Sequence, residues 1–202
     1  LDTARHALAG LAKRSPREGL TDLCQAAHEA IRSIGRQDGS NPASTCTALL
    51  LRGDEAYWIH VGDSRLYHFQ GDRLVSQTRD HTVAELVKSA HAAQAAEVNG
   101  QALYMCLGGQ NDMEPEHGAT ALGSDDWFML CSDGLWGQMQ PERLVHAFSD
   151  RSETLDARLS AIVERAAALP NSDNVTAVAV DWTGQAASRQ AHPARSGGAA
   201  DA

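Results

Sequence analysis

Short apolar runs bounded by turn residues fill the middle of the chain, and this pattern predicts β-strands. The runs expected to form strands are residues 45–53, 56–62, 127–131 and 175–182. Residues 64–78 predict a hairpin with Gly71 and Asp72 at its tip, because such residues favour the tight turn between antiparallel strands. Runs of this length are typical of buried strands, so we expect this block to form the sheets of the core.

Apolar residues at helical spacing occur before and after this strand-rich block. The segments with this spacing are residues 1–35, 82–97, 141–148 and 152–169. Asp80 and Ser152 are the expected N-caps of the second and fourth helices. The glycine-rich residues 99–125 predict irregular structure. Because the strands follow one another while the helices cluster elsewhere, the order of elements favours an α+β fold over parallel βαβ units.

The length and composition indicate one globular domain. The chain has 202 residues, of which 43% are hydrophobic and 21% charged, as is ordinary for a soluble domain. We expect residues 1–183 to form this domain, since no linker interrupts them. Residues 184–202 are rich in alanine, glycine and serine and are expected to be a disordered tail.

The net charge of -9 argues against a general nucleic-acid surface, because phosphate contacts need clustered lysine and arginine. It does not exclude phosphorylated substrates, since bound cations can reverse the local field. No apolar stretch approaches the roughly 20 residues that span a bilayer. The cysteines, none of which forms a CxxC pair, are Cys24, Cys46, Cys106 and Cys131. They are expected to be free thiols in a reducing compartment rather than zinc ligands.

Three aspartates lie in turns beside apolar runs: Asp63 in HVGDSRLY, Asp133 in CSDGLW and Asp173 in NSDNVT. Taken singly, each is a good turn residue. Asp63 and Asp133 follow their strands, whereas Asp173 precedes its strand. If the third strand runs antiparallel to the other two, the three acids meet at one edge of the sheet. Converging carboxylates repel one another unless a cation lies between them, and hard oxygen ligands suit Mg²⁺ or Mn²⁺.

The segments HVGDSRLYHFQGDRLVSQTRDH, CSDGLW and NSDNVTAVAV, in this order, resemble motifs of the metal-dependent protein phosphatases of the 2C type, in the bacterial style. ASTCTALLL and LYMCLGG resemble further segments of that family, so the resemblance covers residues 1–182. It implies two packed antiparallel β-sheets flanked by helix pairs, an α-β-β-α sandwich. It also implies hydrolysis of phosphoserine and phosphothreonine in proteins. The protein would be cytoplasmic. Its partner would be a phosphorylated protein, a target of a Ser/Thr kinase, with no nucleic acid and no membrane involved.

The resemblance implies a cofactor and ligands as well. In this family two Mg²⁺ or Mn²⁺ ions bridge a water that attacks phosphorus, and a third ion can bind more weakly. By position in the motifs, Asp133 and Asp173 are similar to ligands of one core ion. Asp63 is similar to a ligand of the third ion, which the position of Asp133 also contacts. Asn174 would orient Asp173 or its loop.

The chain departs from the family pattern at its start. The family has a phosphate-gripping arginine, an acid in a sequence like NED and a DGxGG turn with a bridging aspartate before its first long helix. Leu1 falls where that helix should already have begun. We therefore expect a chain that lacks N-terminal strands, holds part of the metal site, binds metal weakly and shows little activity. The alternatives are a catalytically inactive pseudophosphatase that acts as a binding or regulatory module, and another metal-dependent phosphoesterase.

Several other residues are interpreted as structural. His60 is expected to be packed in its strand, and His81 to make hydrogen bonds near the start of a helix. Arg65 either pairs with a carboxylate, the favoured interpretation, or reaches substrate. Trp136 is interpreted as core or rim packing. Residues 99–125 are either a flap beside the site or a plain surface loop.

Overall fold

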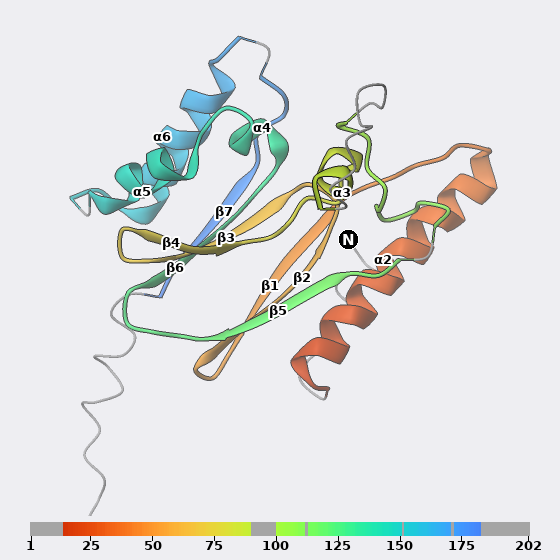
Figure 1. Cartoon of the computed structure of the whole chain (residues 1–202), viewed down its shortest axis with the longest axis horizontal. Helices are drawn as coiled ribbons and strands as arrows, with labels where there is room; N and C mark the ends of the chain where they lie inside the picture. The colour runs from red at the N-terminus through yellow and green to blue at the C-terminus, as the bar shows by residue number, and fades with distance from the viewer. Residues whose placement is uncertain (1–13, 90–99, 112, 151, 171, 183–202) are drawn as a thin grey trace, which may run out of the picture.

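Two antiparallel sheets form the centre of the computed structural model, which describes residues 14–89, 100–111, 113–150, 152–170 and 172–182 (Figure 1). The first sheet has the strand order β1-β2-β5, with β1 at Cys46–Arg52, β2 at Glu55–Val61 and β5 at Glu116–Ala121. The second has the order β4-β3-β6-β7, with β4 at Arg73–Gln77, β3 at Arg65–Gln70, β6 at Asp126–Cys131 and β7 at Ala177–Asp181. The strands predicted from the apolar runs and the hairpin are confirmed.

The inner faces of the two sheets share a core. Its buried members are Ala56 from β2, Leu66 from β3 and Phe128 from β6. Partly buried apolar side chains of both sheets pack around them. Burial of this surface favours the stacked arrangement by roughly 25 cal/mol for each Å² of apolar area removed from water.

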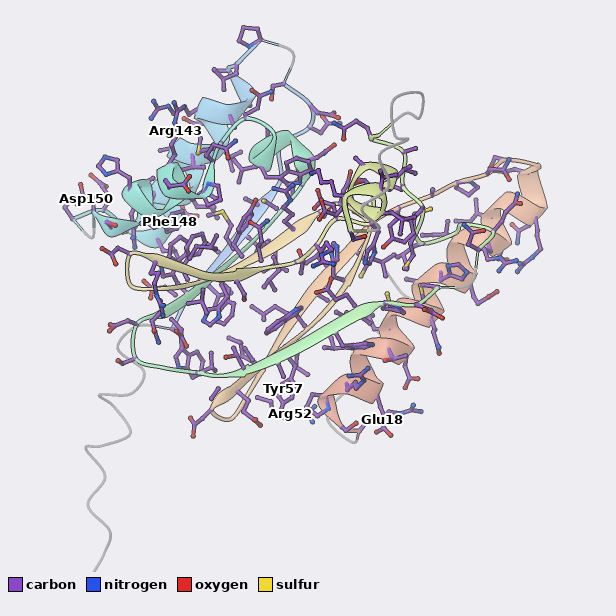
Figure 2. The ribbon with its side chains drawn as sticks, viewed as in Figure 1. Glu18, Arg52, Tyr57, Arg143, Phe148 and Asp150 are labelled. Atoms are coloured by element: carbon purple, nitrogen blue, oxygen red, sulfur yellow. The ribbon has the colours of Figure 1, made fainter. Side chains whose placement is uncertain are left out.

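Helices cover the outer faces and complete the layers. α2, at Pro16–Asp38, packs Leu20 and Cys24 against Ile59 of the first sheet. On the second sheet lie α5, at Pro141–Ser149, and α6, at Leu155–Ala167. Phe148 of α5, labelled in Figure 2, stacks on Trp127 of β6 with 4.7 Å between ring centroids. The order helix, sheet, sheet, helix confirms the predicted α+β sandwich.

One strand, β5, lies inside the segment predicted to be irregular. Its sequence EHGATA lacks the apolar run that marks the other strands. The reason is that Gly118 lies under the ring of Trp58, where an added Cβ would come within 2.0 Å of ring atoms. The side chain that covers this part of the sheet is therefore Trp58 of β2, and the residue beneath it on β5 is a glycine.

The helix ends differ from the predicted ones in their caps. α2 is capped at its start by Ser15, which forms a capping box with Glu18. The helix continues through Gly35 to a left-handed C-cap at Gly39, with φ of 73°. α3, at Val83–Ser89, is capped by the Thr82 hydroxyl rather than by Asp80.

α6 is capped by Thr154 rather than by Ser152. Three predicted segments lie partly or wholly outside the described residues. They are the start of the helix predicted over 1–35, the second half of the helix predicted over 82–97 and the tail expected at 184–202. Within the part of the chain that the structure describes, no helix combines the length and the apolar character needed to cross a membrane.

Candidate metal centre at the ends of the sheets

The register of the second sheet brings the three aspartate turns to the same end of the molecule. Arg65 at the start of β3 pairs with Cys131 at the end of β6, and Cys131 pairs with Ala177 at the start of β7. Asp63 lies just before β3, Asp133 just after β6 and Asp173 shortly before β7. β7 runs antiparallel to β6, which meets the condition set for the Asp133 and Asp173 strands. Asp63, however, lies in the connection between the two sheets, so the acids gather where both sheets end rather than at the edge of one.

The turns of Asp133 and Asp173 are in direct contact. The Ser132 hydroxyl donates to the carbonyl of Asn174 at 3.0 Å and accepts from the Thr176 N–H at 3.0 Å. Gly134 follows in α4, at Asp133–Trp136, and a Cβ at this position would lie 2.6 Å from the Asn174 carbonyl oxygen. Serine and glycine in this turn therefore allow two backbones to approach closely.

Asp63 joins the same group through α4. The indole Nε1 of Trp136 donates to the backbone carbonyl of Asp63 at 2.8 Å. Burial raises the pKa of the Asp63 carboxyl, and the negative charge of nearby Asp133 raises that pKa further. A cation beside these two carboxylates would relieve their repulsion, so the electrostatics of the turn favour a bound positive ion.

The other carboxylates are oriented by their own turns. Asp133 Oδ1 accepts from the Gly134 N–H at 2.9 Å, and Asp173 Oδ1 accepts from the Asn174 N–H at 2.7 Å. The backbone of Asn174, rather than its side chain, thus holds Asp173. For the second oxygen of each carboxylate, the structure shows no hydrogen-bond donor among the residues it describes.

This donor set matches the chemistry of a hard cation. Carboxylate oxygens are the ligands that Mg²⁺ and Mn²⁺ prefer. Across residues 14–182, apart from the gaps given above, no three His, Cys, Asp or Glu side chains are already clustered closely enough to hold an ion. The described residues therefore offer oxygen ligands from neighbouring turns without forming a closed ligand cage.

The histidines near these turns are structural, as predicted. His60 is fully buried, and its Nε2 donates to the Arg79 carbonyl at 3.1 Å. Burial, together with the neighbouring His81, lowers the pKa of His60 to about 4, so the ring is neutral. His81 forms hydrogen bonds with both the N–H and the carbonyl of Gly62.

The structure confirms the favoured interpretation that Arg65 pairs with a carboxylate. Its partner is Asp80, the residue expected to cap a helix, and the sequence did not identify this partner. Trp136, interpreted as packing, contacts the Asp63 backbone. The position of Trp136, one helical turn after Asp133, could have indicated that its side chain lies near the acidic turns. The identity of the Arg65 partner had no such signal, because Asp80 lies outside the strand that holds Arg65.

The sequence model described as Protein phosphatase 2C matches residues 2–190 of this chain. Among curated proteins, protein phosphatase PhpP of Streptococcus pneumoniae is 25% identical over 150 residues, which are 69% of this chain and 61% of that protein. Serine/threonine protein phosphatase PstP of Mycobacterium tuberculosis is 27% identical over 141 residues, 68% of this chain and 27% of that protein. The chain thus spans about three fifths of the length of PhpP.

Solved structures share the fold. The crystal structure of the serine/threonine phosphatase PstP/Ppp of M. tuberculosis aligns with a TM-score of 0.72 and 25% identity, over 90% of this chain and 80% of that chain. The catalytic domain of PstP in complex with two manganese ions aligns with a TM-score of 0.70 and 25% identity, over 89% and 79%.

Proposed function

The chain belongs to the protein phosphatase 2C family, and from this premise we propose that it hydrolyses phosphoserine and phosphothreonine in proteins with the help of divalent cations. The observation that carries the proposal is the meeting of the Asp63, Asp133 and Asp173 turns at one end of both sheets. Carboxylates placed this way can gather cations at a position that a phosphate group can approach from solvent.

Each aspartate has a distinct role in the proposal. Asp133 and Asp173, whose turns touch, would hold one core ion. Asp63 and Asp133, whose charges interact, would hold the third, weaker ion. Bound cations would lower the pKa of coordinated water and neutralise charge on the phosphoryl oxygens. Mn²⁺ is a reasonable choice because the PstP catalytic domain was solved with two manganese ions.

The substrates we propose are proteins that Ser/Thr kinases have phosphorylated. PhpP and PstP are named as protein phosphatases, which supports this substrate class. A cytoplasmic location is part of the proposal. The four cysteines are free thiols, the state that a reducing compartment maintains.

The test is Mn²⁺-dependent hydrolysis of a phosphothreonine peptide by the full-length gene product. We expect Asp133→Ala and Asp173→Ala to abolish turnover, because each removes a ligand of a core ion. Asp63→Ala should weaken turnover while core Mn²⁺ remains bound in calorimetry. Asp156→Ala, at the start of α6, is the matched control and should leave activity unchanged.

Three results would overturn parts of this assignment. Activity that survives both Asp133→Ala and Asp173→Ala would refute their roles. Loss of all bound Mn²⁺ in Asp63→Ala would refute the weaker site. Absence of turnover in the full-length protein, combined with binding of the phosphopeptide, would favour the alternative of a catalytically inactive regulatory module.

A further inference from the structure

A partly buried ion pair lies beside the Asp63 turn. Arg65 donates from Nε to Asp80 Oδ1 and from Nη2 to Asp80 Oδ2, both at 2.8 Å. The two side chains are only 20% and 12% exposed. A bidentate pair of this kind fixes the guanidinium plane as well as its position, and partial burial reduces its screening by salt.

The fixed guanidinium supports Trp136. The Arg65 Cζ atom lies 3.7 Å from the centroid of the indole ring, a close cation–π contact. Arg65 Nη1 also donates to the Tyr67 hydroxyl at 3.1 Å. The indole, held on this face, donates its N–H to the Asp63 carbonyl at 2.8 Å. A continuous series of direct contacts therefore runs from Asp80 through Arg65 and Trp136 to the backbone of Asp63.

The next residue of the same loop holds the other side of the turn. The His81 N–H donates to the Gly62 carbonyl at 2.8 Å, and His81 Nδ1 accepts from the Gly62 N–H at 3.1 Å. Gly62 has φ of 106°, and a Cβ there would lie 2.4 Å from Thr45 Cγ2. The loop at residues 80–81 thus fixes the backbone both before Asp63 and, through Trp136, at Asp63 itself.

We propose that Asp80, Arg65 and Trp136 are positioning residues that set the backbone of the Asp63 turn and, through it, the affinity of the weaker cation site. This inference rests on the proposed function, in which Asp63 is a ligand of that site. It also assigns Arg65 a positioning role, because three of its N–H donors are directed at Asp80 and Tyr67 and its face at Trp136.

Two substitutions test the series at different points. Trp136→Phe keeps an aromatic ring beneath Arg65 but removes the indole N–H that donates a hydrogen bond to the Asp63 carbonyl. Asp80→Asn keeps the shape of the side chain but removes the charge that fixes Arg65. Calorimetric Mn²⁺ titration of the full-length protein should show the weaker binding step reduced about fivefold in each variant, the size expected from one lost hydrogen bond.

A double-mutant cycle separates positioning from general destabilisation. In an Asp63→Ala background, neither substitution should change the remaining Mn²⁺ affinity. Equal reductions with and without Asp63 would overturn the inference, as would unchanged affinity in the single variants. Trp127→Phe is the matched control, because it removes an indole hydrogen bond of 2.9 Å to the Gly71 carbonyl, in the tip of the β3–β4 hairpin. It should leave the weaker step unchanged.

Hydrogen exchange gives a second readout that does not depend on metal. Asp80→Asn should speed exchange of the Trp136 indole N–H about tenfold and leave the Trp127 indole N–H unchanged. Unchanged exchange at Trp136 would overturn the inference. If the wild-type protein binds no Mn²⁺ at all, the proposed function fails, and this exchange measurement still decides whether the positioning contacts exist.

Discussion

Gly134 is the residue on which the contact between two acidic turns depends. A Cβ there would lie 2.6 Å from the Asn174 carbonyl oxygen and 3.1 Å from that of Asp173. Gly134→Ala should therefore push the Asp173 loop away from Asp133. We expect it to lower the free energy of unfolding by about 1–3 kcal/mol, as overpacking does, and to weaken Mn²⁺ binding. Urea denaturation and calorimetry measure the two effects.

Gly123→Ala is the control for this substitution. Its nearest neighbour would be the flexible end of Gln70, 3.3 Å away, so little must move. Mn²⁺ binding should be unaffected there. Equal Mn²⁺ affinity in Gly134→Ala and wild type would contradict the close contact between the turns.

Single residues were predictable from sequence where the signal was local. The three aspartates stood out because each joins a turn to an apolar run, and His81 because it follows Asp80 at a helix start. Asp80 was misassigned because an acid before a helix usually caps it, whereas here Arg65 competes for the carboxylate from a neighbouring strand. Contacts between residues distant in sequence leave no local pattern to read.

At the scale of elements, the start of α6 gives a direct test of a cap. The Thr154 hydroxyl accepts from the Ala157 N–H at 3.2 Å, so Thr154→Ala should lower the free energy of unfolding by about 1 kcal/mol. Ser152→Ala should change it little, because Ser152 precedes the helix and its backbone N–H, which the substitution keeps, donates to Asp150. Chemical denaturation of both variants measures the two free energies of unfolding and shows which residue caps α6. A larger loss in Ser152→Ala would favour the cap expected from sequence.

Elements were predictable when their own residues carried the periodic signal. The strands from 45 to 78 and the helix at 141–148 follow from apolar spacing alone. β5 was missed because its packing partner, Trp58, supplies the bulk that strands usually carry themselves. A strand whose cover lies on its neighbour cannot be recognised from its own sequence.

For the whole molecule, His60 links stability to pH. Its pKa is about 4 in the folded protein, lowered by burial and by His81, against an ordinary value of 6.5 when unfolded. Below pH 6.5 His60 is protonated in the unfolded state but stays neutral in the folded state. The free energy of unfolding therefore falls as the pH decreases toward 4. The loss from this residue between pH 7 and pH 5 is about 2 kcal/mol.

Urea denaturation at both pH values tests this link. His60→Gln should flatten the pH dependence, whereas substitution of the exposed His146 should not. If wild type and His60→Gln lose equal stability between pH 7 and pH 5, His60 is not the residue responsible.

The layered architecture followed from the resemblance of the motifs, and the structure confirms it in two sheets with helices outside. Sequence order alone favoured an α+β fold but did not divide the strands between sheets. That division places Asp63 in a connection between layers. The sequence alone therefore predicted the three acids at the edge of a single sheet, whereas the structure places them where both sheets end.

The most direct test of the central claim is Mn²⁺ binding by isothermal titration calorimetry to wild type, Asp133→Ala and Asp156→Ala. Asp133 is the carboxylate that both proposed ions share, whereas Asp156 lies in α6. We predict that wild type and Asp156→Ala bind Mn²⁺ alike and that Asp133→Ala loses more than about 100-fold in affinity. Equal Mn²⁺ affinity in all three proteins would contradict a metal centre at these turns.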